Sequence, residues 1–238
     1  MSIIQKILFP KLLTVISKRT YYIKDKNESN EGIYSPKTAN DCDGQIKKWP
    51  SEKRLQFNFH PETETAFNQQ IGTEFKAFYN YLSMAAFFGR ADVVMPGCQS
   101  FFTQMYMEEF EHALQFLNYV NMRGGSVNLS GISPPNVQNW NCPLYAFKEA
   151  LKLEIAVTNK LVTANEIAEK HKDLSASDFI VTGYLENQMK SVNEFEKFIT
   201  VLSGIGDKTL SRFMFDKDLM DNYVLSKFNV LQNKNKNN

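Results

Sequence analysis

Glu109 and His112 are the residues of this chain whose types and spacing most directly suggest chemistry. They lie in a segment whose apolar residues recur at helical intervals: Phe101, Met105, Phe116, Leu117 and Val120. This pattern predicts an amphipathic helix that turns both polar side chains toward the core. A buried carboxylate and a buried imidazole need compensation, and one metal ion can compensate both. Alone the pair is weak support for a metal site, because a Glu and a His at this spacing are more often a surface pair or a satisfied polar contact in the core.

The composition of the 238 residues is that of an ordinary soluble protein with one domain plus tails. The net charge of +1 indicates neither nucleic acid nor acidic substrates as partners. There is no run of eighteen apolar residues, so no membrane span is expected. The three cysteines, Cys42, Cys98 and Cys142, form no Cys-x-x-Cys pair, and their odd number argues against a disulfide framework. A reducing compartment is therefore expected.

The first 24 residues differ in kind from the rest. They contain five basic residues and many apolar ones, with no acid before Asp25. This is the composition of a mitochondrial transit peptide, and residues 25–54 are then expected to be a polar linker. A secretory signal is the main alternative, although Lys11 interrupts its hydrophobic region and no small-x-small cleavage site follows. An uncleaved cytosolic tail is the third interpretation.

Apolar periodicity predicts four long helices and a short fifth between residues 55 and 222, followed by a C-terminal tail over residues 223–238. The helices are expected from Pro61 to about Gly89, through Phe101 to Arg123, from about Pro143 through Val162, from Ser175 to Leu202 and from Leu210 to about Met220. Residues 126–142 form an unusually long link between the second and third helices. A crossover that joins two parallel neighbours explains it, so the fold class is all-α, a four-helix bundle.

Each long helix adds polar residues to its inward stripe. They are Glu74 and Tyr81 on the first helix, Glu109 and His112 on the second, Glu154 on the third and Gln188 on the fourth. Inward carboxylates and a Glu-x-x-His motif on facing helices are the ligand pattern of di-iron bundles. Oxygen donors with one imidazole favour iron or manganese over copper, and the lack of thiolate pairs argues against structural zinc.

Over about residues 55–222, the chain resembles ferritin of the heavy-chain, ferroxidase-bearing type. The resemblance is carried by these segments: Glu-Phe-Lys-Ala-Phe-Tyr-Asn-Tyr-Leu-Ser-Met (74–84), Glu-Glu-Phe-Glu-His-Ala (108–113), Arg-Gly-Gly (123–125), Leu-Lys-Leu-Glu (151–154), Tyr-Leu-Glu-Asn-Gln (184–188) and Phe-Asp-Lys (215–217). They occur in the order and at the spacings of that family. With the basic N-terminus, they suggest a mitochondrial ferritin.

The resemblance implies a role for each ligand. Glu74 and His112 match ligands of a first iron position, and Glu109 matches the carboxylate that bridges the two irons. Glu154 matches a ligand of the second iron. The implied reaction is oxidation of Fe(II) by oxygen, with storage of the ferric product in a hollow shell of about 24 subunits built from such bundles.

Gln188 matches the residue that places oxygen or water beside the iron pair, and Tyr81 matches a hydrogen-bonded tyrosine often given an electron-transfer role. With a glutamine on the fourth helix and no second Glu-x-x-His, the second position has fewer anionic ligands than the first. Weak binding there suits iron as a substrate that leaves. Two alternatives stay open: a mainly structural shell subunit that co-assembles with another chain, and a di-iron oxygenase, which retains iron and acts on an organic substrate.

Some positions depart from the family pattern. Asp178 falls where the family places an acid in the threefold channel for iron, but Val181 replaces the second acid, which weakens the expected attraction of cations. On the inner surface, Glu108 and Glu111 match carboxylates proposed to nucleate mineral, whereas Leu114 replaces a further acid. Mineralisation is therefore expected to be less efficient than oxidation, unless both changes are neutral.

Overall fold

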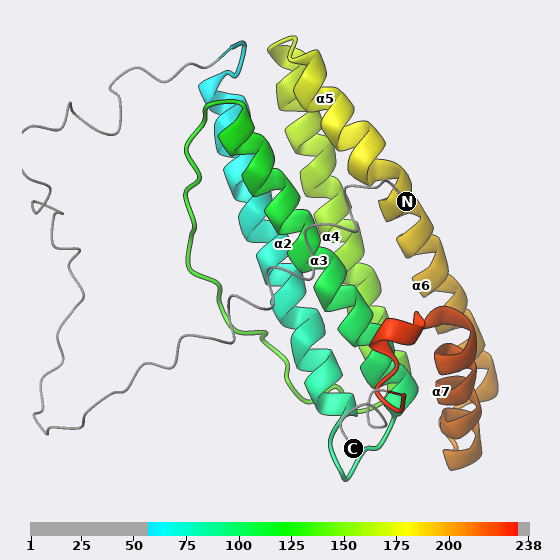
Figure 1. Ribbon diagram of the computed structural model, residues 1–238. Coiled ribbons are helices and arrows are strands. Elements are labelled where there is room, and N and C mark those ends of the chain that lie inside the picture. Colours follow the sequence, from blue (N-terminus) through cyan, green and yellow to red (C-terminus); the bar gives the residue numbers. More distant parts are fainter. Residues whose placement is uncertain (1–56, 233–238) are drawn as a thin grey trace, which may run out of the picture. The chain divides into compact units, whose positions relative to one another are not determined.

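Four long helical segments lie side by side in the structure, a computed structural model that describes residues 57–232 (Figure 1). They are α2 (Pro61–Phe88), α3 (Pro96–Met122), α4 (Pro143–Lys170) and a fourth segment made of α5 (Leu174–Ile180), a π-helical stretch (Val181–Leu185) and α6 (Glu186–Ile205). A shorter α7 (Thr209–Tyr223) and a 3₁₀ turn (Ser226–Phe228) follow. No strand occurs in the described residues, so the predicted all-α bundle with a short fifth helix is confirmed. The predicted transit peptide (1–24) and polar linker (25–54) lie outside the described residues, as does the end of the tail.

The link between α3 and α4 runs along the length of the bundle (Figure 1), so these two helices are parallel, as the sequence predicts. Hydrogen bonds fix it to α2. The side chain of Asn68 donates to the carbonyl of Ser126 (3.0 Å) and accepts from the backbone N–H of Asn128 (2.6 Å). Near its other end Trp140 is buried and donates to Ser83 (3.2 Å). The link is therefore attached to α2 near both of its ends.

The three helices that carry the predicted carboxylates all begin with proline: Pro61, Pro96 and Pro143. Proline suits the first turn, because its fixed φ matches the helix and its missing N–H has no partner there. At the start of α3, the buried Asp216 of α7 accepts from the N–H groups of Gly97 (2.9 Å) and Cys98 (2.7 Å). This contact caps α3 and attaches α7 to it.

The fourth segment differs from the single helix expected over residues 175–202. The π-helical stretch inserts an extra residue into the turn and shifts the helical phase of everything after it. As a result Gln188 is buried, whereas Met189, expected on the inward stripe, is 64% exposed. Tyr184 lies within the stretch, is buried and donates to Gln115 of α3 (3.0 Å).

The inward face of α4 also differs from the expected one. It is built largely from small residues, with Ala146, Ala150, Ala164 and Ala168 buried beside Phe147, Val157 and Leu161. Ile155 and Val162, expected on that face, are 43% and 40% exposed. On α7 the same holds for Phe213 and Met214, which are exposed, whereas Phe215 is buried. Alanine lets helices approach closely, but a search for large apolar residues overlooks it.

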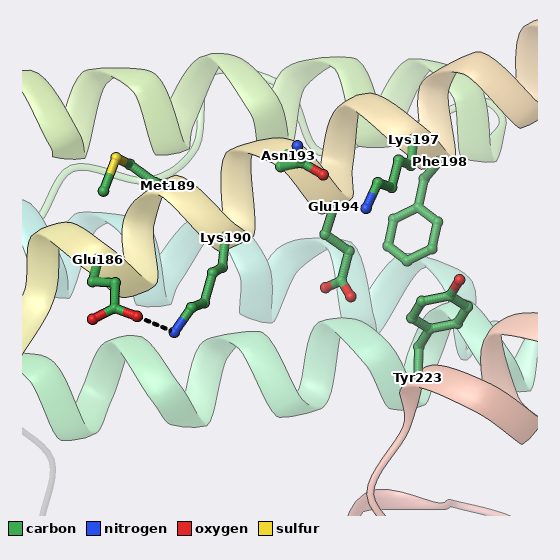
Figure 2. A pocket seen from close by; sticks show the side chains of 8 residues that line it. All are labelled: Glu186, Met189, Lys190, Asn193, Glu194, Lys197, Phe198 and Tyr223. Atoms are coloured by element: carbon green, nitrogen blue, oxygen red, sulfur yellow. Dashed lines mark ion pairs between the residues drawn. The ribbon is translucent and has the colours of Figure 1, made fainter.

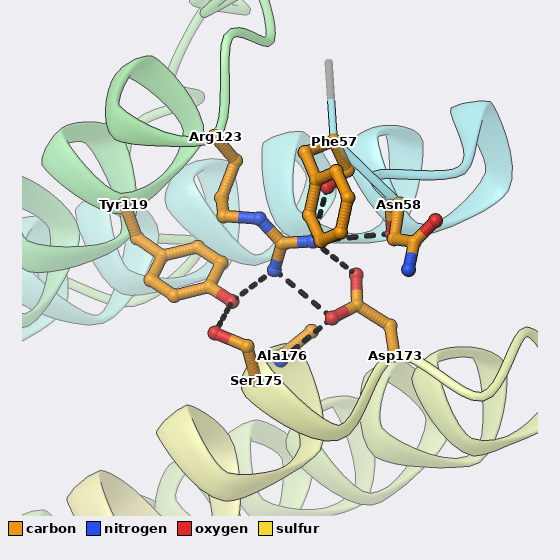
Figure 3. Close-up of polar contacts among 7 residues, drawn as sticks. All are labelled: Phe57, Asn58, Tyr119, Arg123, Asp173, Ser175 and Ala176. Carbon is orange, nitrogen blue, oxygen red and sulfur yellow. Dashed lines mark hydrogen bonds and ion pairs between the residues drawn. The ribbon is translucent and has the colours of Figure 1, made fainter.

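One end of the bundle is held by Arg123, at the end of α3 (Figure 3). Its guanidinium donates to both carboxylate oxygens of Asp173, which precedes α5, at 2.9 Å. It also donates to the carbonyls of Phe57 and Asn58, which precede α2, at 3.1 Å. A planar guanidinium with several donors can satisfy all these acceptors at once, so the segments before α2 and α5 are both fixed to α3. Among the helices of the described part, none has the length and apolar character needed to cross a membrane.

Candidate metal centre

Three predicted ligands meet in the core between α2 and α3. Glu74 comes from α2, and Glu109 and His112 come from successive turns of α3. One donor atom of each lies within 4.8 Å of the other two. Both glutamates are almost fully buried (0% and 2% exposed), and the His112 side chain is 14% exposed. The Glu-x-x-His spacing therefore brings both side chains to one place, facing a third ligand from the neighbouring helix.

Two carboxylate oxygens in this group, Glu74 Oε2 and Glu109 Oε2, are buried and have no hydrogen-bond partner. The nearest cationic candidate is His112, whose Nδ1 lies 3.5 Å from Glu109 Oε2, too far for a good hydrogen bond. A buried oxygen without a partner is costly, and a buried charge costs more. The two oxygens and the imidazole are thus the donor set that a divalent cation requires, and a cation would remove this cost.

Glu154 of α4 has both of its oxygens occupied by hydrogen bonds. The buried Tyr81 hydroxyl donates to Oε1, and Gln188 Nε2 donates to Oε2 at 2.9 Å. Glu154 therefore stands outside the three-ligand group. Its negative charge is nevertheless close enough to raise the pKa of Glu109. The centre therefore has two unequal halves. In one half, donor atoms of Glu74, Glu109 and His112 converge. The other half is Glu154, whose carboxylate accepts hydrogen bonds from the neutral side chains of Tyr81 and Gln188.

Burial raises the pKa of all three glutamates. Burial is the largest cause for Glu74, followed by the charge of Glu109. For Glu109 burial is followed by the charge of Glu154. The pKa of Glu154 rises to about 7 through burial, although hydrogen bonds from Tyr81 and Gln188 oppose the rise. A cation that binds here therefore competes with protons for these carboxylates.

Sequence reasoning missed Gln70. It is 1% exposed, and its Nε2 donates to Glu74 Oε1 at 2.7 Å. The bond holds one oxygen of Glu74 and leaves the other free to face Glu109. The signal was present, since Gln70 lies one turn before Glu74 on the same stripe, but an uncharged residue was not sought as a partner for a ligand.

The acids assigned to other steps lie apart from the three-ligand group. Glu108 and Glu111 are half-buried, and the charge of Glu108 contributes to raising the pKa of Glu109 and Glu154. Asp178 is exposed and accepts from Thr182 at 3.0 Å. Val181 is 44% exposed in the π-helical stretch.

A further acid, Glu194 of α6, was not singled out from the sequence. It lines a groove of about 480 Å³ along α6, together with Lys190 and Tyr223 of α7 (Figure 2). Burial raises its pKa, and the charge of Glu108 adds to the rise. The negative charges of Glu194, in this groove, and Glu108, next to Glu109 of the metal centre, therefore repel each other.

A family comparison matches residues 64–205, more than half of the chain, to the ferritin-like domain of the ferritin family. The chain belongs to the ferritin family. It is 38% identical to the soma ferritin of Lymnaea stagnalis over 163 residues, which cover 68% of this chain and 93% of that protein. It is 39% identical to the ferritin-1 heavy chain of Schistosoma mansoni, over 68% and 94% of the two chains. It is 37% identical to the middle subunit of ferritin from Aquarana catesbeiana, over 67% and 92%.

Family membership confirms the ferritin resemblance inferred from the motifs. Ferritins handle iron and form shells of several subunits, so this chain is an iron-storage shell subunit. In this ferritin-family chain the buried donor group lies within the matched domain.

Proposed function

We propose that this chain is a heavy-chain-like ferroxidase subunit, which oxidises Fe(II) with oxygen and stores the ferric product. The observation that carries the proposal is the buried group of Glu74, Glu109 and His112, with two carboxylate oxygens that lack partners. A shell subunit without catalysis does not need unsatisfied carboxylates in its core, because they lower its stability. Iron is the substrate of this site.

The unequal halves of the centre give its residues different tasks. Glu74, Glu109 and His112 bind the first ferrous ion through free donors. Glu154 binds the second ion. Its carboxylate must first lose the hydrogen bonds that it accepts from Tyr81 and Gln188. Because Glu109 interacts with both Glu74 and Glu154, it is the carboxylate placed to bridge the two ions.

Two ferrous ions together give two electrons to one O2, which takes up two protons and leaves as hydrogen peroxide. The second ion has the weaker position, since binding there breaks existing hydrogen bonds, and this favours release of the product. Release along Glu108 and Glu111 then brings ferric iron toward the inner surface of the shell. Of the two positions that carry acids in the family's channel for iron, only Asp178 is acidic here, and it is the residue proposed to attract iron at that channel.

The proposed assembly is a shell of about 24 subunits built from such bundles. The described helices expose several large apolar side chains, which subunit contacts would cover. They include Ile155 and Val162 on α4, Met189 on α6 and Phe213 and Met214 on α7. The mass of the assembled protein, measured by native mass spectrometry, tests the number of subunits.

The proposed location is the mitochondrion, with secretion and the cytosol as alternatives. The proposal rests on the basic, acid-free composition of residues 1–24. Sequencing the N-terminus of the mature protein tests it. A start shortly after Arg19 supports mitochondrial processing, whereas an intact Met1 contradicts it.

Ferrous oxidation in air, followed by ferric absorbance, tests the catalytic proposal. The assembled protein should oxidise iron rapidly, and Glu109→Ala/His112→Ala should fall to the rate of protein-free solution. Glu166→Gln, on the exposed surface of α4, is the matched control and should oxidise iron normally. Undiminished oxidation in the double variant rejects the site. Slow oxidation by the unsubstituted protein favours a structural subunit, and iron that stays tightly bound favours an oxygenase.

A further inference from the structure

The chain has three histidines, and each belongs to a group of potential metal ligands. His112 is in the buried centre. His60 and His171 form the other group found in the described residues, together with Glu62. One donor atom of each of these three residues lies within 4.8 Å of the other two. We infer that His60, Glu62 and His171 form a second metal site at the end of the bundle, which takes a divalent transition-metal ion such as Zn²⁺.

The three ligands come from two ends of helices that meet in space. His60 is the N-cap of α2 and Glu62 lies in its first turn, whereas His171 is the C-cap of α4. The two imidazole rings stack with their centroids 3.4 Å apart and their planes 11° from parallel. His171 Nε2 lies 2.9 Å from Glu62 Oε2. The side chains are thus already in contact, and a metal ion requires the two rings to rotate out of their stack and Lys170 to leave Glu62.

The backbone that carries these ligands is fixed on both sides. Arg123 binds the carbonyl of Asn58, two residues before His60, and the carboxylate of Asp173, two residues after His171 (Figure 3). Phe59, directly before His60, is 4% exposed and packs against buried aromatic rings. Because the main chain is held, the entropy lost on binding is confined to a few side chains, which favours binding.

Two imidazoles and one carboxylate are a donor set for zinc or ferrous iron, with room for water at the remaining positions on this exposed surface. Magnesium and calcium prefer oxygen ligands and are disfavoured. Lys170 is the competitor, since its Nζ lies 2.6 Å from Glu62 Oε2 and supplies the positive charge now balancing that carboxylate. A metal ion must displace Lys170.

This site goes beyond the proposed oxidation. A metal ion here would join the start of α2 to the end of α4. It shares no ligand with the buried centre, so iron oxidation should not depend on it.

Zinc titration of the full-length, metal-free protein by calorimetry tests the inference. The double variant His60→Gln/His171→Gln should lose one zinc ion per subunit and keep its rate of ferrous oxidation. The same loss should appear when the substitutions are made in Glu109→Ala/His112→Ala, where the buried centre no longer contributes. An unchanged number of zinc ions in both backgrounds overturns the inference, whatever the result for iron oxidation.

Single substitutions separate the cluster from general surface charge. Glu62→Gln should weaken zinc binding, whereas Glu169→Gln, an exposed acid two residues before His171, should not. Lys170→Met removes an exposed competitor and should tighten binding roughly 1.5- to 5-fold, the range that the strength of surface ion pairs implies. Crystals soaked in zinc provide a direct readout: an anomalous peak among the three side chains supports the site, and peaks only at the buried centre contradict it.

Discussion

Replacing Gln70 tests whether the free oxygen of Glu74 is held in position for a metal. Gln70→Leu keeps a similar volume but removes the donor that lies 2.7 Å from Glu74 Oε1. That hydrogen bond also lowers the pKa of Glu74, against the larger effect of burial. Without it, Glu74 is less well oriented and its pKa rises further. Both effects weaken metal binding.

The size of the effect follows from the charge of the acceptor. A hydrogen bond to a charged group contributes about 1.5–3 kcal/mol, so its loss corresponds to roughly 10- to 100-fold weaker binding at the first position. Anaerobic titration with Co²⁺, followed by its visible absorption, measures this affinity without oxidation. Ferrous oxidation at limiting iron should slow in the same variant, and excess iron should restore part of the rate.

Gln69→Leu is the matched control, because Gln69 is the same residue type one position earlier and is exposed. Its affinity for Co²⁺ should equal that of the unsubstituted protein. If Gln70→Leu and Gln69→Leu bind Co²⁺ equally well, Gln70 does not position Glu74 and the reasoning fails. Thermal unfolding of both variants shows whether any loss reflects the fold instead.

Three further predictions concern protons and helix docking. Binding of Co²⁺ to the metal-free protein should strengthen as pH rises through about 7, because the raised pKa of Glu154 lets protons compete with the metal below that pH. A pH-stat titration should detect the released protons. Tyr81→Phe removes a hydrogen bond that lowers the pKa of Glu154, so the same pH dependence should shift upward. Asp216→Ala should lower the free energy of unfolding by about 1–3 kcal/mol, because the cap of α3 is lost. Asp218 is an exposed neighbour, so Asp218→Ala should have little effect, and thermal unfolding compares the two variants.

The sequence was sufficient for the bundle and for the meeting of Glu74, Glu109 and His112, three of the five predicted ligands. Helical periodicity placed Glu109 and His112 one turn apart on an inward face, and proline and glycine marked the helix ends. The length of the link after α3 predicted the parallel crossover. These features depend on spacing along one chain, which a sequence shows directly.

Features that depend on contacts between helices were not predictable in this way. Gln70 is recognised as part of the site only when its hydrogen bond to Glu74 is seen. Small residues such as Ala146 and Ala150 form part of the buried face of α4, whereas the larger Ile155 is exposed. The π-helical stretch has no distinctive composition, so the exposure of Met189 could not be anticipated.

The π-helical stretch Val181–Leu185 divides the fourth helical segment into two parts with different rotational phase. Each residue of a helix turns the chain by about 100°, so one extra residue decides which side of α6 faces the core. Gln188 is thus placed by the number of residues before it as much as by its own identity. Deleting one exposed residue of this stretch, with every side chain of the metal centre retained, would turn Gln188 away from Glu154. In this segment, the number of residues before Gln188 helps to determine the geometry of the site.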